Sequence, residues 1–173
     1  MAQKSRDMTH VALMVVLLAV CAWISVPAPV PFTLQTFGVF CALTLLGPRK
    51  GAAAIGVYLA MGVIGLPVFS GFAGGAGQLL GATGGYLLGF LPMAGVYALV
   101  KRLGGRDVLA LGLGLALCYA FGTFWYTLVY THGNLTGLGS AFLWCVAPFI
   151  VPDGAKMALA LWLSRILKQH ITI

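Results

Sequence analysis

Apolar residues run through this chain in long stretches that are separated by short polar or glycine-rich connections. A helix that crosses the roughly 30 Å hydrocarbon layer of a bilayer needs about 20 mostly apolar residues. Six stretches meet or approach that length: 8–26, 34–47, 51–66, 84–103, 107–130 and 150–169. The second and third are short, which favours helices that end below one membrane surface or tilt little. The pattern predicts an all-α integral membrane protein in which residues 1–173 form one domain of six transmembrane helices.

Two other stretches bear on the number of spans. The N-terminal stretch has the basic start and apolar centre of a secretory signal peptide, but the even spacing of the later spans favours an uncleaved first helix. Between the fifth and sixth spans lies THGNLTGLGSAFLWCVAP, which becomes apolar in its second half. That half predicts a short helix or a segment that dips into the membrane.

The composition supports a bilayer location. Mean hydropathy is +1.01 and 8% of the residues are charged, whereas about 25% are charged in soluble domains. The net charge of +7 is typical of some nucleic-acid-binding proteins. Here, however, the basic residues form small clusters between apolar spans and not one continuous face, so no nucleic acid is expected as a partner.

The positions of the basic residues predict the orientation. Nine of the ten fall at the N-terminus, in the second or fourth connection, or near the C-terminus: Lys4, Arg6, Arg49, Lys50, Lys101, Arg102, Arg106, Arg165 and Lys168. The first, third and fifth connections carry none. Because basic residues accumulate on the cytoplasmic side, both termini are predicted to be cytoplasmic. Lys156 is the exception.

Metal and cofactor sites are not expected. The four cysteines (Cys21, Cys41, Cys118 and Cys145) fall in apolar stretches without CxxC spacing, which is typical of buried packing residues. The three histidines are scattered along the chain. The sequence has no GxxxxGK[ST] phosphate loop, and GAGQLLG is a poor dinucleotide fingerprint. The chain is therefore not expected to hydrolyse ATP alone.

The outer connections have an unusual content. The first reads VPAPVPFTLQTF, in which the prolines stiffen an extended backbone. The third reads GLPVFSGFAGGAGQLLGATGGY, which is rich in glycine, uncharged and also apolar. A flexible solvated loop would be polar. The composition favours an apolar glycine-rich outer loop that folds down as a lid.

The pair Asp153 and Lys156 begins the last apolar span. Residues three apart share a helix face, and Pro152 favours a helix start, which would place Asp153 in the first turn near the outer surface. Ionisable residues inside membranes are rare and usually face a cavity or a substrate path. The pair is therefore a candidate grip for a small solute, with a purely structural ion pair as the alternative. A partner ATPase is a simpler energy source than proton transfer through one paired acid.

Several stretches together resemble the BioY family, the biotin-specific substrate-capture (S) components of energy-coupling factor (ECF) transporters. The likeness covers essentially the whole chain, in VPFTLQTFGVF (30–40), LLGPRKGA (45–52), GLPVFSG (65–71), GATGGYLLGF (81–90) and PFIVPDGAK (148–156). The resemblance implies six membrane helices and a high-affinity biotin-binding subunit for biotin uptake. It also implies a bacterial plasma (inner) membrane location, a transmembrane coupling (T) protein and ABC-type ATPase subunits as partners, and no enzymatic activity or cofactor.

The resemblance also implies roles for individual residues. Asp153 matches an acid expected to bind the ureido N–H groups, and Lys156 matches a lysine expected to bind the ureido oxygen or the valerate carboxylate. The two outer loops supply further candidates: Thr33, Gln35, Gly74, Gly75, Gln78 and Tyr86. The chain departs from the family pattern at Ala82, where a proline is usual, and at Val151-Pro152, where Pro-Gly is usual. Small residues allow close helix approach in lipid, so the candidates for docking the coupling protein are Ala12, Ala19 and Ala22, although their spacing is not the usual Ala-xxx-Ala.

Other functions remain open at this point. One is an S component for a different vitamin, and another is a structural or assembly protein in which the charged pair fixes helix register. An intramembrane enzyme would need a nucleophile and a base, and Ser70, Ser140, His132 and His170 show no such grouping.

Overall fold

The computed structural model describes residues 2–26, 31–130 and 138–170. Within them the regular secondary structure is helical apart from one small hairpin, so the predicted all-α class is confirmed. The helices are α1 (Ala2–Trp23), α2 (Gln35–Val63), η1 (Ser70–Phe72), α3 (Ala76–Leu80), α4 (Gly84–Arg102), α5 (Asp107–Tyr130), α6 (Leu138–Cys145) and α7 (Ala147–His170). The strands β1 (Ser25–Val26) and β2 (Phe32–Thr33) pair antiparallel, with Ser25 opposite Thr33.

Helix α2 is a hairpin of two helices. In a straight helix, residues 35 and 58 would be about 35 Å apart, but the side-chain amide of Gln35 donates to the Tyr58 hydroxyl at 2.7 Å. The chain reverses at Gly47, whose φ of 78° is readily adopted only by glycine. Pro48 then begins the second half, where its missing N–H costs nothing. The two halves (35–46 and 48–63) correspond to the predicted second and third spans.

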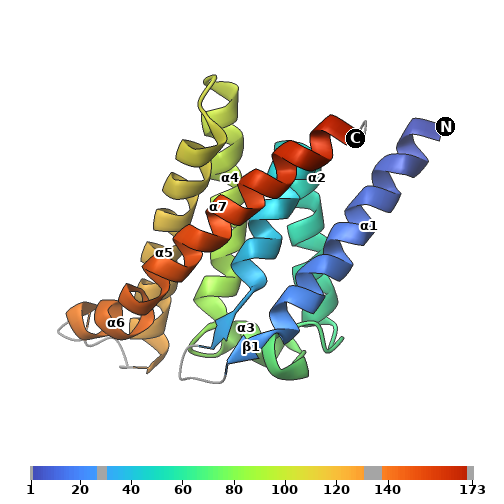
Figure 1. Cartoon of the computed structure of the whole chain (residues 1–173). Helices are drawn as coiled ribbons and strands as arrows, with labels where there is room; N and C mark the ends of the chain where they lie inside the picture. The colour runs from blue at the N-terminus through green and yellow to red at the C-terminus, as the bar shows by residue number, and fades with distance from the viewer. Residues whose placement is uncertain (1, 27–30, 131–137, 171–173) are drawn as a thin grey trace.

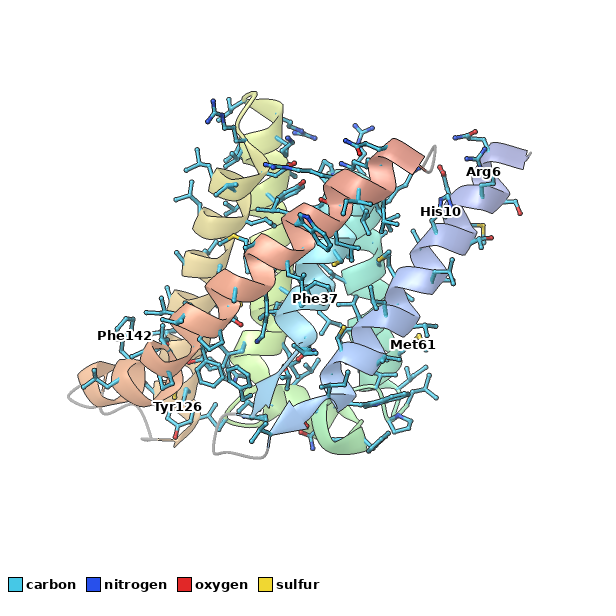
Figure 2. All side chains as sticks on the ribbon, viewed as in Figure 1. Arg6, His10, Phe37, Met61, Tyr126 and Phe142 are labelled. Carbon is cyan, nitrogen blue, oxygen red and sulfur yellow. The ribbon has the colours of Figure 1, made fainter. Side chains whose placement is uncertain are left out.

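The bundle has two distinct ends. Figure 1 shows the N- and C-termini and the α4–α5 turn at one end, and β1, α3 and α6 at the other. Nitrogen-tipped side chains gather at the terminal end, where Arg6 lies (Figure 2). The second and fourth connections, with their basic residues, thus share an end with both termini.

Packing and surface composition match a protein surrounded by lipid. The first half of α2 lies at the centre, and α2 packs against α1, α4 and α7. Large apolar side chains nevertheless face outward, including Leu103 and Val151 at 80% exposure. Among the described residues, three helices are long and apolar enough to cross a membrane: Gln3–Trp23, Gly84–Arg102 and Asp107–Val129.

Two details of the sixth span differ from expectation. Helix α7 begins at Ala147, so the prediction that Pro152 starts the helix is wrong, and Asp153 lies beyond the first turn. The short helix expected before this span is present as α6, and the backbone N–H of Phe149 bonds to the Val146 carbonyl where α6 meets α7. Because α6 feeds almost directly into α7, the helix is already formed when the chain reaches Pro152.

Candidate functional site

A cavity of about 130 Å³ lies inside the bundle, walled by residues from most of its elements. Its polar lining comes from Thr33, Gln35, Thr36, Ser70, Gln78, Thr83, Tyr86, Tyr119, Asp153 and Lys156. Its apolar and sulfur lining comes from Pro31, Phe69, Leu87, Phe90, Leu115, Cys118, Cys145, Phe149. A cavity in which apolar walls are combined with converging polar groups is typical of small-molecule sites.

Asp153 and Lys156 form a buried ion pair on the wall of this cavity. Their spacing of three places them on one face of α7, and Lys156 Nζ lies 2.7 Å from Asp153 Oδ1. Their side chains are 2% and 8% exposed, respectively. They are the only charged residues among those that line the cavity.

Other elements complete the hydrogen bonds of the pair. Thr36 donates to Asp153 Oδ1 at 2.8 Å, and Tyr119 donates to Asp153 Oδ2 at 2.6 Å. Lys156 Nζ also donates to the Thr33 carbonyl at 2.6 Å and to Thr36 Oγ1 at 3.2 Å. The same Nζ lies 4.5 Å from the centre of the Phe32 ring, within the range of a cation–π contact. Residues from β2, α2, α5 and α7 therefore meet at the pair.

The remaining polar candidates also reach the cavity. Gln35 is buried and donates to Tyr58, whose hydroxyl in turn donates to the Val68 carbonyl at 3.0 Å. The Tyr86 hydroxyl lies 3.1 Å from Thr123 Oγ1. Gln78 is exposed and also lines the cavity. The structure therefore brings Thr33, Gln35, Gln78, Tyr86, Asp153 and Lys156 together at one site.

Gly74 and Gly75 do not line the cavity; they shape the connecting segment 64–83. A Cβ added to Gly74 would lie 2.4 Å from the Leu66 carbonyl oxygen, so only glycine fits there. Gly75 has a φ of 96°, and its N–H donates to the Gly62 carbonyl at 2.7 Å. Both glycines thus fold the segment onto the end of α2.

Two tryptophans anchor the 64–83 segment at its two ends. Trp23 at the end of α1 donates from Nε1 to the Pro67 carbonyl at 2.8 Å, and its ring stacks on Phe72 at 5.0 Å. Trp125 on α5 donates to the Gly81 carbonyl at 3.0 Å. Between these anchors Phe69 is 2% exposed. Val68 and Phe69 are therefore packed against the bundle, whereas Leu66, Phe72 and Leu80 of the same segment are exposed.

The three alanines predicted to dock a partner lie in different surroundings. Ala19 and Ala22 are 6% and 0% exposed and belong to the core, so neither offers an accessible surface. Ala12 is exposed and lines a groove with Val11, Ala53 and others between α1 and the second half of α2. Only Ala12 remains available for docking.

Sequence reasoning missed several residues of the site. Thr36 follows directly after Gln35 in the outer connection VPFTLQTFGVF. Tyr119 carried a signal of its own, because a tyrosine within an apolar span needs a partner for its hydroxyl. Phe32 and Phe149, which stack at 5.5 Å beside the pair, carried no signal that distinguishes them from ordinary packing residues.

A helical bundle with an apolar outer surface and an internal cavity lined by a buried charged pair is typical of a membrane-embedded protein that binds a small molecule. The sequence model of the BioY family matches residues 1–172, and the chain belongs to that family. The family predicted from the sequence motifs is thereby confirmed. The chain is a multi-pass membrane protein, and the family is one of transporter subunits.

Known relatives cover nearly the whole chain. A probable biotin transporter BioY of Pyrococcus horikoshii is 40% identical over 168 residues, which is 96% of this chain and 99% of the relative. The biotin transporter BioY of Thermotoga maritima is 39% identical, covering 95% of this chain and 96% of the relative. The crystal structure of the S-component for biotin from an ECF-type ABC transporter superposes with a TM-score of 0.84 at 29% identity, over 97% of this chain and 93% of that one.

Proposed function

We propose that this chain is the biotin-binding subunit of an uptake transporter and that it captures biotin in the cavity at the α3–α6 end of the bundle. The observation that carries the proposal is the buried Asp153–Lys156 pair on the wall of an otherwise uncharged cavity. Biotin offers a ureido group with two N–H donors and one oxygen, a fused apolar ring system and a valerate chain. Asp153 supplies the acceptor for an N–H group, and side chains such as Phe69, Phe90 and Leu115 supply apolar walls.

The proposed arrangement in the membrane follows from charge. The two halves of α2 count as two spans, and with α1, α4, α5 and α7 they make six. The end that carries the termini, Arg49, Lys50 and Lys101 faces the cytoplasm. The cavity then faces the outside, and the 64–83 segment acts as its lid. The membrane is the plasma membrane of the cell.

The proposed partners are a transmembrane coupling protein and ABC-type ATPases. The name of the structural neighbour, an S-component of an ECF-type ABC transporter, supports this assignment. The groove beside Ala12, which runs along the N-terminal half of α1, is the proposed contact for the coupling protein. Close packing there is favoured by small residues such as Ala12 and Ala53.

Equilibrium binding of radiolabelled biotin to the purified chain in detergent tests the proposal. We expect saturable binding. Unlabelled biotin should displace the radiolabelled biotin, whereas excess thiamine or riboflavin should not. Asp107→Asn is a matched control, because Asp107 is also paired with a lysine, at 2.9 Å from Lys101, but at the cytoplasmic end. Displacement by another vitamin would assign a different substrate, and binding of none would favour a structural role.

A further inference from the structure

The ammonium group of Lys156 makes its hydrogen bonds to other groups of the chain. An ammonium has three donors, and Lys156 Nζ has three acceptors in range: Asp153 Oδ1 at 2.7 Å, the Thr33 carbonyl at 2.6 Å and Thr36 Oγ1 at 3.2 Å. Thr36 can accept from Lys156 while it donates to Asp153 Oδ1. No donor of Lys156 is left for a ligand in this arrangement.

The two carboxylate oxygens of Asp153 accept different numbers of hydrogen bonds. A carboxylate offers about four lone-pair positions. Oδ1 accepts from both Lys156 and Thr36, whereas Oδ2 accepts from Tyr119 at 2.6 Å. Asp153 and Tyr119 both line the cavity. The acceptor position that remains on Oδ2, beside the Tyr119 hydroxyl, is thus the charged hydrogen-bonding position open to a ligand.

We infer that Tyr119 is a positioning residue that sets ligand specificity: it holds Asp153 Oδ2 so that this oxygen accepts one N–H of a urea-type ligand. The inference rests on the proposed function. Thr36 and Lys156 fix one carboxylate oxygen from the side of α2 and β2, and Tyr119 fixes the other from α5. The plane of the carboxylate is therefore set before the ligand arrives, which reduces the cost of ordering it on binding. Without the Tyr119 hydroxyl, the carboxylate is free to turn Oδ2 away from the cavity.

The chain contains a matched control for this residue. Tyr97 is also a buried tyrosine that donates to an aspartate, Asp107, at 2.8 Å, and this pair lies at the α4–α5 turn at the other end of the bundle. Tyr119→Phe and Tyr97→Phe therefore remove the same atom and the same kind of hydrogen bond. Only the first of them touches the cavity.

The test measures dissociation constants for biotin and for two analogues, each methylated on one ureido nitrogen. In the unmodified protein, the analogue that lacks the N–H facing Asp153 is expected to bind more weakly than biotin. Tyr119→Phe is expected to weaken biotin binding about tenfold or more, because a charge-assisted hydrogen bond between Asp153 and the ligand is lost. Tyr119→Phe should weaken binding of the analogue that lacks the N–H facing Asp153 much less. The dissociation constants of biotin and of this analogue should therefore become more similar. Tyr97→Phe should change neither constant, and melting temperatures in detergent report on folding separately.

A second variant tests the same inference on the other oxygen. Thr36→Val removes the hydroxyl that donates to Asp153 Oδ1. It is expected to weaken the binding of biotin and of both analogues by the same factor. An analogue-dependent loss in Thr36→Val would show that the ligand meets Oδ1 and would overturn the role of Tyr119. If Tyr119→Phe weakens the binding of all three ligands equally, or of none, the role of Tyr119 is overturned while the proposed function stands. Failure of the unmodified chain to bind biotin would overturn the proposed function as well.

Discussion

Replacing the Asp153–Lys156 pair separates a role in binding from a role in folding. Asp153→Asn keeps the shape of the side chain but removes its charge. A hydrogen bond between a ligand N–H and a carboxylate contributes about 1.5–3 kcal/mol, and each ~1.4 kcal/mol is a factor of ten in affinity. We therefore expect Asp153→Asn to weaken biotin binding by one to two orders of magnitude. Asp107→Asn, in a partly exposed aspartate–lysine pair outside the cavity, should leave it unchanged.

Like Asp153→Asn, Lys156→Met breaks the buried pair, and each of the two variants is expected to lower the melting temperature. Lys156→Met leaves a carboxylate whose side chain is 2% exposed without its counter-charge. Breaking a buried pair in this way costs about 3–5 kcal/mol of folding stability. It also removes the bond from Nζ to the Thr33 carbonyl that joins β2 to α7. A clearly lower melting temperature is expected, together with weaker binding.

The double variant Asp153→Leu/Lys156→Met is decisive. Replacing both members of a buried pair by apolar residues is often neutral or stabilising, so the double variant should melt above Lys156→Met and insert normally. Some cost remains, because the hydroxyl groups of Thr36 and Tyr119 lose their acceptor, at about 1–3 kcal/mol for each group left unsatisfied. It should not bind biotin. Tight biotin binding by a folded double variant would refute the assignment of the pair to the ligand.

Three further predictions concern the lid and the topology. Trp23→Leu removes the indole bond and the ring contact that anchor the 64–83 segment, and it should speed biotin release, as measured by stopped-flow or chase experiments. Gly74→Ala places a Cβ 2.4 Å from a backbone oxygen and should weaken binding, whereas Gly77→Ala, with nothing within 4 Å, is the neutral control. In intact cells, cysteines introduced beside Phe72 should react with impermeant reagents from outside, and those beside Lys101 only from the cytoplasm.

Each of these has a clear contrary result. An unchanged release rate in Trp23→Leu would mean that the 64–83 segment does not control ligand exit. Equal effects of Gly74→Ala and Gly77→Ala would contradict the close approach at Gly74. Labelling beside Lys101 from outside would contradict the six-span arrangement.

Much of the fold was predictable because it depends on local patterns. Apolar length predicted the helices, and the spacing of three between Asp153 and Lys156 predicted their shared face. Gly47 and Pro48 mark the reversal within α2, because one tolerates positive φ and the other cannot continue a helix from the preceding turn. Cys21 and Cys41 are buried, as their apolar surroundings predicted.

The partners of the pair were not predictable, because they depend on how separate helices rotate against one another. Thr36 lies 117 positions from Asp153, and Tyr119 lies 34 positions from it. In a soluble helix the polar face identifies the outer side, but helices that are apolar all round carry no such mark. The same ambiguity explains Ala19 and Ala22, which are small residues used for packing within the bundle and not for contact with a partner.

The chemistry of α7 has a consequence for how the protein is made. This helix follows all the other described helices in the sequence, and it is not among the three that qualify as spans by apolar length alone. Acidic and basic residues oppose insertion of a helix by up to about 2.5–3.5 kcal/mol each, the value at the helix centre, and Asp153 and Lys156 lie in the first half of α7. In α7 that cost is reduced by hydroxyl donors from α2 and α5, which the ribosome has already delivered. The stability of α7 in the membrane thus depends on correct placement of α2 and α5, because these two helices supply the donors to its carboxylate.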